Sequence, residues 1–332
     1  MTLKTKAILL LLTATIIWGV SSPINRHAMT FVNPWPFSAV RYLFGSVALL
    51  PLVLRWGHRK APAQYFHYDI GRFMALKSGL CLGFLLTVGT ALQLFGLTMT
   101  TASKSGFITS LYVSMVALFG FVMGQIPRRQ VWIGLSLCLI GLAFIGGNTA
   151  EQSGFNLGDA LTLVADLIWV AHIVIMGYFA VRVNPWKLVA SQSFVCSLLC
   201  FIIALSTDTM CSWPEFVRAL PSMAWGVMAV SVAYVCQAVA QINTSPAAAA
   251  ITLQFQPVIG ATCGVIFLGE QLSWPMGIGA ALLIAGALTA QRAQEPVKIT
   301  ADHPRYEMIR AARLATAILI LGGCGLSVWM TI

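Results

Sequence analysis

Two ionisable residues lie deep inside long apolar runs and are the first candidates for chemistry. Asp166 lies about nine residues into a run that begins at residue 157, and Arg41 lies within the run 36–54. If these runs cross a membrane, a charge inside them is costly and marks a functional site by default. Asp166 could bind an amine, relay a proton as a coupling site, or pair with Arg41. Arg41 could hold a carboxylate of a ligand or join two helices.

Uncharged polar and aromatic side chains in the same runs extend this candidate site. Some recur at helical spacing and therefore share one face of a helix, and others stand alone among apolar residues. Amide and hydroxyl groups suit neutral or zwitterionic polar ligands, although hydrogen bonds between helices, worth about 0.6 to 2 kcal/mol each, explain some of them equally well. The candidate ligand-binding residues are Trp18, Ser21, Asn25, Arg41, Gln93, Tyr112, Asp166, Trp169, Gln192, Tyr234, Gln237 and Gln254.

Three further titratable residues in the runs are assigned structural roles. Lys77 and Lys104 lie within about one turn of the ends of their runs, so their side chains are expected to extend the charge to the membrane surface. His172 lies well round the helix from Asp166. We expect it to be a satisfied contact between helices.

The elements that must position these residues are membrane helices. The chain has 332 residues, of which 58% are hydrophobic and 9% charged, whereas a soluble domain usually carries about 25% charged residues. Runs of about 20 apolar residues are long enough to cross a bilayer as helices. The predicted fold is an all-α integral membrane protein, with ten transmembrane helices and an extra C-terminal helix within 311–331. The ten spans are 7–28, 36–54, 73–97, 102–123, 131–145, 157–181, 186–205, 223–241, 246–268 and 276–290.

Charge and motifs exclude several classes of protein. Fifteen of the twenty Lys and Arg residues lie in segments on the same side as the N-terminus, which predicts a cytoplasmic N-terminus by the positive-inside rule. The net charge of +10 is therefore a topological signal, and no nucleic-acid partner is expected. The sequence contains no HExxH helix and no Walker A loop. We expect no catalytic residues, no metal and no cofactor, and we read the eight cysteines as small core residues.

The chain repeats itself. Trp18 and Trp35 are separated by 17 residues, as are Trp169 and Trp186, so the two copies are offset by 151 residues. Further matches follow in the same order at offsets of 143 and 145. The repeats are predicted to cover 7–146 and 157–292. Because each contains an odd number of spans, the second copy enters the membrane from the opposite side, which is the inverted-repeat architecture of many alternating-access transporters.

These features resemble the EamA-like branch of the drug/metabolite transporter superfamily. The resemblance covers roughly 7–292 and is carried by Ile17-Trp18-Gly19, Asn33-Pro34, Arg41, Thr101 to Thr109, Gly158-Asp159, Ile168 to Ile173, Gln192 and Gly269 to Leu272. It implies two inverted five-helix repeats around a central cavity, in a bacterial inner membrane, moving amino acids or related metabolites, often outward. One departure is Gln256-Pro257, where relatives often carry Glu-Pro, because Gln256 cannot take up a proton.

The expected function is secondary transport of a small polar metabolite, most readily export. The alternatives are an uptake exchanger of the same fold and, outside transport, a membrane receptor or scaffold. The expected partners are a small-molecule substrate and the lipid bilayer, and the expected state is a monomer or homodimer.

Overall fold

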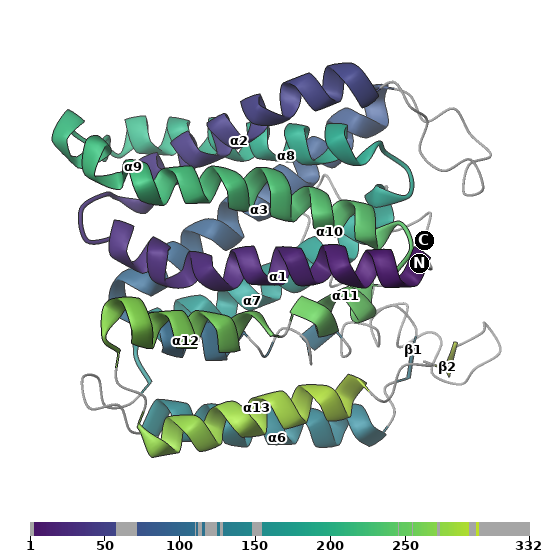
Figure 1. The fold of residues 1–332 in the computed structure, drawn as a ribbon, viewed down its shortest axis with the longest axis vertical. Coiled ribbons are helices and arrows are strands. Elements are labelled where there is room, and N and C mark those ends of the chain that lie inside the picture. The colour runs from purple at the N-terminus through teal and green to yellow at the C-terminus, as the bar shows by residue number, and fades with distance from the viewer. Residues whose placement is uncertain are drawn as a thin grey trace.

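The computed structural model describes residues 3–57, 72–109, 111, 115–116, 125–126, 129–147, 155–244, 246–253, 255–270, 273–291 and 297–298. Within these ranges nearly every element is a helix (Figure 1). The first half contains α1 (Leu3–Ala28), α2 (Pro34–Trp56), α3 (Arg72–Met99), α4 (Ala102–Thr109) and α6 (Arg129–Gly147). The second half contains α7 (Leu157–Ala180), α8 (Pro185–Ser206), α9 (Trp213–Met228), the π-helix η2 (Ala229–Ala233), α10 (Tyr234–Gln241), α11 (Pro246–Leu253), α12 (Gln256–Leu268) and α13 (Trp274–Gln291). Two short strands, β1 (Gln125–Ile126) and β2 (Val297–Lys298), pair antiparallel.

Six helices of the described part are long and apolar enough to cross a membrane. They are Thr5–Ala28, Pro34–Trp56, Met74–Met99, Leu157–Ala180, Pro185–Ser206 and Trp213–Gln241. Shorter apolar helices occupy the predicted fifth, ninth and tenth spans. Half of the predicted fourth span, and all of the extra helix within 311–331, lie outside the described residues.

The predicted start of the eighth span, residue 223, is wrong. The helix begins at Trp213 and runs through α9, η2 and α10 to Gln241. Glu215 and Arg218 break the apolar pattern in its first turns. The helix forms there nevertheless, because the Glu215 carboxylate accepts hydrogen bonds from the backbone N–H (2.7 Å) and hydroxyl (2.8 Å) of Ser212, which caps the helix.

The repeated Asn-Pro-Trp motif begins the second helix of each half. Asn33 caps α2 and Asn184 caps α8, and each side-chain oxygen accepts a hydrogen bond of 3.1 Å from the backbone N–H of the following tryptophan. Proline at the first position of each helix is favourable, because its missing N–H would have no partner there. The repeat in the sequence is therefore a repeat of local structure.

Glycines bring helices from the two halves close together. A methyl group added to Gly141 on α6 would lie 2.6 Å from the carbonyl oxygen of Gly279 on α13, and one added to Gly286 would lie 2.5 Å from the carbonyl oxygen of Gly134. Figure 1 shows α6 and α13 as a pair side by side, apart from the main bundle. Small residues allow such close approach of backbones in a membrane, where van der Waals packing stabilises helix pairs.

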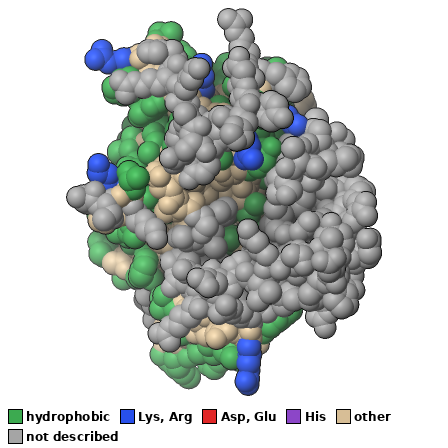
Figure 2. Space-filling model, turned by 90° about the vertical axis from the view of Figure 1, so that its right-hand side faces the viewer, with side chains coloured by type: hydrophobic (Ala, Val, Ile, Leu, Met, Phe, Trp, Pro, Cys, Tyr) green, Lys and Arg blue, Asp and Glu red, His purple; other side chains and the backbone are tan. Residues whose placement is uncertain are grey.

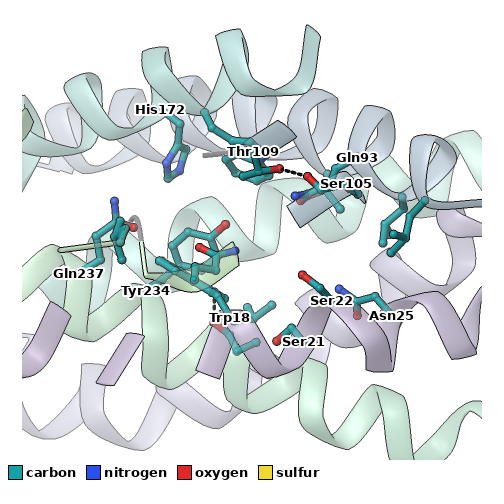
Figure 3. A pocket seen from close by; sticks show the side chains of 18 of the residues that line it. Trp18, Ser21, Ser22, Asn25, Gln93, Ser105, Thr109, His172, Tyr234 and Gln237 are labelled. Carbon is teal, nitrogen blue, oxygen red and sulfur yellow. Dashed lines mark hydrogen bonds between the residues drawn. The ribbon is translucent and has the colours of Figure 1, made fainter. Parts of the chain in front are cut away.

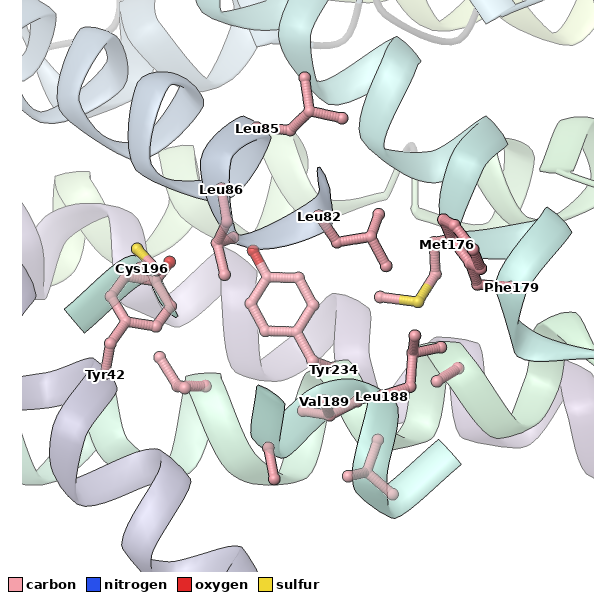
Figure 4. Close-up of a cluster of buried hydrophobic side chains, with 14 of the residues drawn as sticks. Tyr42, Leu82, Leu85, Leu86, Met176, Phe179, Leu188, Val189, Cys196 and Tyr234 are labelled. Atoms are coloured by element: carbon pink, nitrogen blue, oxygen red, sulfur yellow. The ribbon is translucent and has the colours of Figure 1, made fainter. Parts of the chain in front are cut away.

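The buried core lies between the helices, and apolar side chains also cover the outside. One cluster joins α2, α3, α7, α8 and α10, and Figure 4 shows Leu82 and Leu86 of α3 facing Tyr234 and Met176 across it. Large exposed side chains such as Trp274 (76%) and Phe267 (71%) would contact lipid. Figure 2 views the end of the bundle at which α1 begins; the charged side chains visible there among the described residues are Lys and Arg.

Candidate functional site

A cavity of about 120 Å³ lies inside the bundle, between α1, α2, α3, α4, α7 and the helix that contains η2 (Figure 3). At about 10 to 15 Å³ of such volume per water molecule, it has room for on the order of ten waters. Its wall combines aromatic rings, hydroxyls, amides and one guanidinium. The lining residues are Trp18, Ser21, Ser22, Asn25, Arg41, Tyr42, Thr90, Gln93, Leu94, Leu97, Ser105, Thr109, Trp169, His172, Ile173, Ala229, Val230, Tyr234, Gln237, Leu253 and Gln256.

The structure brings together most of the residues proposed from the sequence as a ligand site. Those in the cavity wall are Trp18, Ser21, Asn25, Arg41, Gln93, Trp169, Tyr234 and Gln237. Asp166 and Gln192 are fully buried but do not line the cavity. Tyr112 and Gln254 lie outside the described residues.

Trp18 and the π-helix form one aromatic wall. The indole N–H of Trp18 donates a hydrogen bond of 3.2 Å to the carbonyl oxygen of Ala229, the first residue of η2. The Trp18 and Tyr234 rings meet edge to face, with centroids 4.9 Å apart. A π-helical turn leaves backbone carbonyls without their usual α-helical donors, and such turns are frequent at functional sites. The Trp18 indole is thus anchored to a backbone carbonyl at the start of this turn.

Arg41 brings a positive charge to the cavity wall. Its side chain is only 7% exposed and contacts the rings of Phe37 and Tyr42, with its guanidinium carbon 5.1 and 5.0 Å from their centroids. Its Nη1 donates a long hydrogen bond of 3.4 Å to Asn25 Oδ1. No ion pair joins Arg41 to any described acidic residue, so the pairing with Asp166 considered above is absent from this part of the chain.

His172 is both a helix contact and part of the cavity wall. Its Nε2 lies 3.2 Å from Oε1 of Gln192 on α8, and its ring packs edge to face with Tyr234 at 5.7 Å. The expectation of a helix-contact residue was therefore incomplete. Gln192 contacts the His172 ring on the side away from the cavity and does not itself line the cavity.

Asp166 is fully buried on α7, and neither carboxylate oxygen has a hydrogen-bond partner among the described residues. It lies within interaction range of Thr109 on α4, and Thr109 lines the cavity. The Thr109 hydroxyl donates to the Ser105 carbonyl (2.9 Å). A buried ionised carboxylate without a partner is costly. Asp166 therefore stays a candidate for proton coupling, placed just behind the cavity wall.

Lys104 does not extend to the membrane surface, contrary to the expectation from its place near the end of a run. It is completely buried, and its Nζ lies 2.6 Å from Oδ2 of Asp159 at the start of α7. The Thr100 hydroxyl donates to the same carboxylate (2.7 Å). Beside this pair, Glu270 accepts hydrogen bonds from the backbone N–H groups of Ala102 (2.8 Å) and Ser103 (2.9 Å), which closes the N-terminus of α4. Lys104 and Asp159 are both buried, and Glu270 beside them is partly buried.

Sequence analysis missed several polar residues of the cavity wall. Ser105 and Thr109 are one turn apart on α4, so helical spacing would have found them. Gln256 was noted only because it stands where relatives often carry Glu. Tyr42 and Thr90, whose oxygens are 2.9 Å apart, lie on two different helices, so no spacing in the sequence connects them. The missed residues are Ser22, Tyr42, Thr90, Ser105, Thr109, His172 and Gln256.

Comparison with known proteins agrees with this arrangement. A sequence profile of the EamA-like transporter family matches residues 5–147 and again residues 156–290. An uncharacterized transporter of Archaeoglobus fulgidus is 28% identical over 82% of this chain and 82% of its own length. The uncharacterized transporter YwfM of Bacillus subtilis is 26% identical (87% and 95%), and the uncharacterized inner membrane transporter YedA of Escherichia coli is 25% identical (78% and 81%).

One solved crystal structure superimposes with a TM-score of 0.62 at 19% sequence identity, covering 86% of this chain and 95% of the other. The fold is therefore shared beyond recognisable sequence similarity. The prediction from the sequence motifs is confirmed, because the two profile matches together span more than half of the chain. The chain is a member of the EamA-like transporter family and, like its named relatives, a multi-pass membrane transporter.

Proposed function

We propose that this protein is a secondary transporter that moves a small polar metabolite, an amino acid or a related compound, across the inner membrane by alternating access, in the direction of export. The observation that carries the proposal is the cavity between the helices, whose wall combines Trp18, Tyr234 and Arg41 with amides and hydroxyls. Ligand sites typically pair apolar and aromatic walls with a few polar groups that fix orientation. We propose no catalytic residues and no cofactor.

Two inverted five-helix repeats, 7–146 and 157–292, would supply the moving parts. Reciprocal contacts support a two-fold relation between them, because Gly141 packs on Gly279 while Gly286 packs on Gly134. Gly134 and Gly279 are equivalent positions of the two repeats, as are Gly141 and Gly286, each at an offset of 145 residues. In an inverted repeat the two halves can exchange conformations, which opens the same cavity alternately to each side. An extra helix within 311–331 would add to the ten spans.

The distribution of charge supports a cytoplasmic N-terminus. The end of the bundle at which α1 begins carries Lys and Arg side chains in Figure 2, with no described Asp or Glu in view. Basic residues are retained on the cytoplasmic side of a bacterial membrane. On this orientation the buried pair Lys104–Asp159 lies at the outer end, and the cavity lies between the outer end and the middle of the bundle.

Asp166 is the proposed coupling residue. It lies nine residues after Leu157, the first residue of α7, which corresponds to a depth of about 14 Å at 1.5 Å per residue. Its equivalent in the first repeat, at an offset of 151, is Thr15, whose hydroxyl donates to the carbonyls of Leu11 (2.7 Å) and Thr252 (3.2 Å). The repeats thus differ at this position by one titratable group, which would give one half a proton to carry.

The test is counterflow in liposomes. The purified protein would be reconstituted with a panel of labelled amino acids, hydroxy acids and related metabolites. Saturable uptake that depends on unlabelled substrate inside the vesicle is expected for at least one compound. If uptake occurs only with substrate inside the vesicle, and none is seen with empty vesicles, the result would favour an exchanger. No flux of any compound by correctly folded protein would contradict transport and favour a receptor or scaffold.

Two variants test the coupling role of Asp166. Asp166→Asn removes the titratable proton, and Asp166→Thr installs the residue that the first repeat carries at the equivalent position. Both are expected to keep counterflow without a pH gradient and to lose the stimulation by a pH gradient. Stimulation that persists in both variants would exclude Asp166 as the coupling site. The partners on this proposal are the substrate and the bilayer, with the protein acting as a monomer or homodimer.

A further inference from the structure

The cavity wall contains a buried positive charge whose counter-charge is missing among the described residues. Arg41 is 93% buried, its Nε has no hydrogen-bond partner there, and its contact with Asn25 is long. Cation–π contacts to Phe37 and Tyr42 offset part of the desolvation cost of the guanidinium. They do not neutralise it, and a buried charge is normally paired with an opposite charge.

The described acidic residues that are buried or partly buried inside the bundle make no ion pair with Arg41. Asp159 is paired with Lys104, and Glu270 closes the N-terminus of α4. Asp166 makes no ion pair with Arg41 and lies outside the cavity wall. An anion that enters the cavity would therefore be the natural partner of the Arg41 guanidinium.

The site holds the guanidinium in place. A methyl group added to Gly226 on α9 would lie 3.1 Å from Cδ and 3.3 Å from Cβ of Arg41, so the absence of a side chain at position 226 makes room for the aliphatic stem. A planar guanidinium with a fixed stem offers two parallel N–H donors, which match the two oxygens of a carboxylate. The second repeat carries neutral Gln192 at the equivalent position, so this charge is specific to one half.

A second unsatisfied group lies at the other end of the cavity. Gln237 is 2% exposed, and its Oε1 has no donor among the described residues. Figure 3 shows Gln237 at one end of the site and Asn25, the hydrogen-bond partner of Arg41, at the opposite end, with Trp18 and Tyr234 between them. Buried polar atoms are nearly always hydrogen-bonded, so Gln237 Oε1 is positioned to accept a donor from a ligand.

From these two groups we infer the chemical class of the ligand: a small monocarboxylate that carries a hydrogen-bond donor, an amine or hydroxyl, at its other end. Its carboxylate binds Arg41, its donor binds Gln237 Oε1, and its carbon skeleton packs on the rings of Trp18 and Tyr234. A second carboxylate would find no counter-charge in the described wall. This inference rests on the proposed transport function for its physiological meaning, but the binding that it describes can be measured separately.

Binding to wild-type protein is the primary test. Trp18 and Trp169 line the cavity, so their fluorescence can report titration of the detergent-solubilised protein. The probes are 5-aminopentanoate, 6-aminohexanoate, 5-hydroxypentanoate and 6-hydroxyhexanoate, each beside its primary amide. At least one acid is expected to bind at least about tenfold more tightly than its amide. Equal binding of acid and amide in every pair, or no binding of any acid, would overturn the inference.

Variants locate each contact. Arg41→Gln installs the residue of the second repeat, and we expect it to abolish the preference for acid over amide, while Arg41→Lys retains part of it. Arg218→Gln removes an exposed arginine from α9 and serves as the control with unchanged binding. Gln237→Leu is expected to weaken 6-hydroxyhexanoate to the affinity of hexanoate, which lacks the terminal hydroxyl, and to leave hexanoate unchanged. An intact acid preference in Arg41→Gln would also overturn the assignment.

The same samples separate this inference from the transport function. If the acids bind through Arg41 but no counterflow occurs in liposomes, the ligand class stands and the transport proposal fails. If compounds without a carboxylate are exchanged as well as the acids, transport stands and the ligand class is wrong.

Discussion

The buried charged side chains fall into two groups: those that form an ion pair within the fold and those that have no ion-pair partner among the described residues. Lys104 and Asp159 form a pair at 2.6 Å with both side chains almost inaccessible, whereas Arg41 and Asp166 have no ion-pair partner among the described residues. Replacing a complete buried pair is often tolerated, but removing one member leaves an uncompensated charge. The first pair is therefore assigned to stability and the other two residues to function.

Lys104→Met should reveal the structural role of this pair. We expect it to destabilise the protein by about 3 to 5 kcal/mol, because Asp159 loses its counter-charge in a buried site. The double variant Lys104→Met, Asp159→Asn should recover much of this loss. Reversible unfolding in mixed micelles would measure both. If the single and double variants are equally stable, the pair does not contribute as described.

At the scale of the element, the π-helix sets which residues of its helix face the cavity. The helix Trp213–Gln241 contains η2 at Ala229–Ala233, immediately before Tyr234. One extra residue in such a turn rotates all that follows by about 100° relative to a regular α-helix. Tyr234 and Gln237 reach the cavity after this rotation, and Trp18 bonds to the carbonyl of Ala229 at its start.

Deletion of Val232 should convert η2 to a regular α-helix and turn Tyr234 and Gln237 out of the cavity. Val232 is 42% exposed, so its loss leaves no core cavity. We expect the deletion variant to insert and fold but to lose ligand binding and counterflow, whereas Val232→Ala keeps both. Fluorescence titration and liposome counterflow would measure the effect. Unimpaired binding in the deletion variant would show that the π-helical turn has no role in forming the site.

The whole molecule combines two similar halves with different chemistry. Equivalent positions hold Trp18 and Trp169, and the Asn33 and Asn184 caps repeat in detail. The charges do not repeat, because Arg41 corresponds to Gln192 and Asp166 to Thr15. The symmetric packing of the two halves would allow the protein to adopt two opposite conformations. The asymmetric charges would place ligand binding in one half and proton coupling in the other.

Orientation in the membrane is testable with single cysteines in a background without the eight native cysteines. Thr207, after α8, and Asn243, after α10, are both exposed and follow opposite ends of the bundle. With the N-terminus inside, Thr207→Cys in whole cells should react with an impermeant maleimide. Asn243→Cys should react only after permeabilisation. The reverse pattern would invert the topology and place the Lys104–Asp159 pair at the inner end.

Local signals in the sequence determined most of the elements. Apolar length predicted helices close to α1, α2, α3, α7 and α8, and the family resemblance is confirmed, because both depend on residues near one another in the chain. Helical spacing likewise grouped Trp18 with Asn25. These features need no knowledge of what packs opposite. The start of α9 was missed because Glu215 and Arg218 interrupt the apolar pattern, although the cap formed by Ser212 and Glu215 stabilises the helix there.

Only the tertiary structure decided which buried polar groups are satisfied. Lys104 meets Asp159, 55 residues away in sequence, and His172 meets Gln192 on the next helix. Asp166 shares a helical face with Trp169 yet lies behind the cavity wall, because α4 packs against α7 and covers that side. The spacing of a side chain along its own helix gives the direction in which it points. Its interaction partner is set by the neighbouring helices. In a low-dielectric interior this partner decides whether a charged side chain stabilises the fold or is free to bind a ligand.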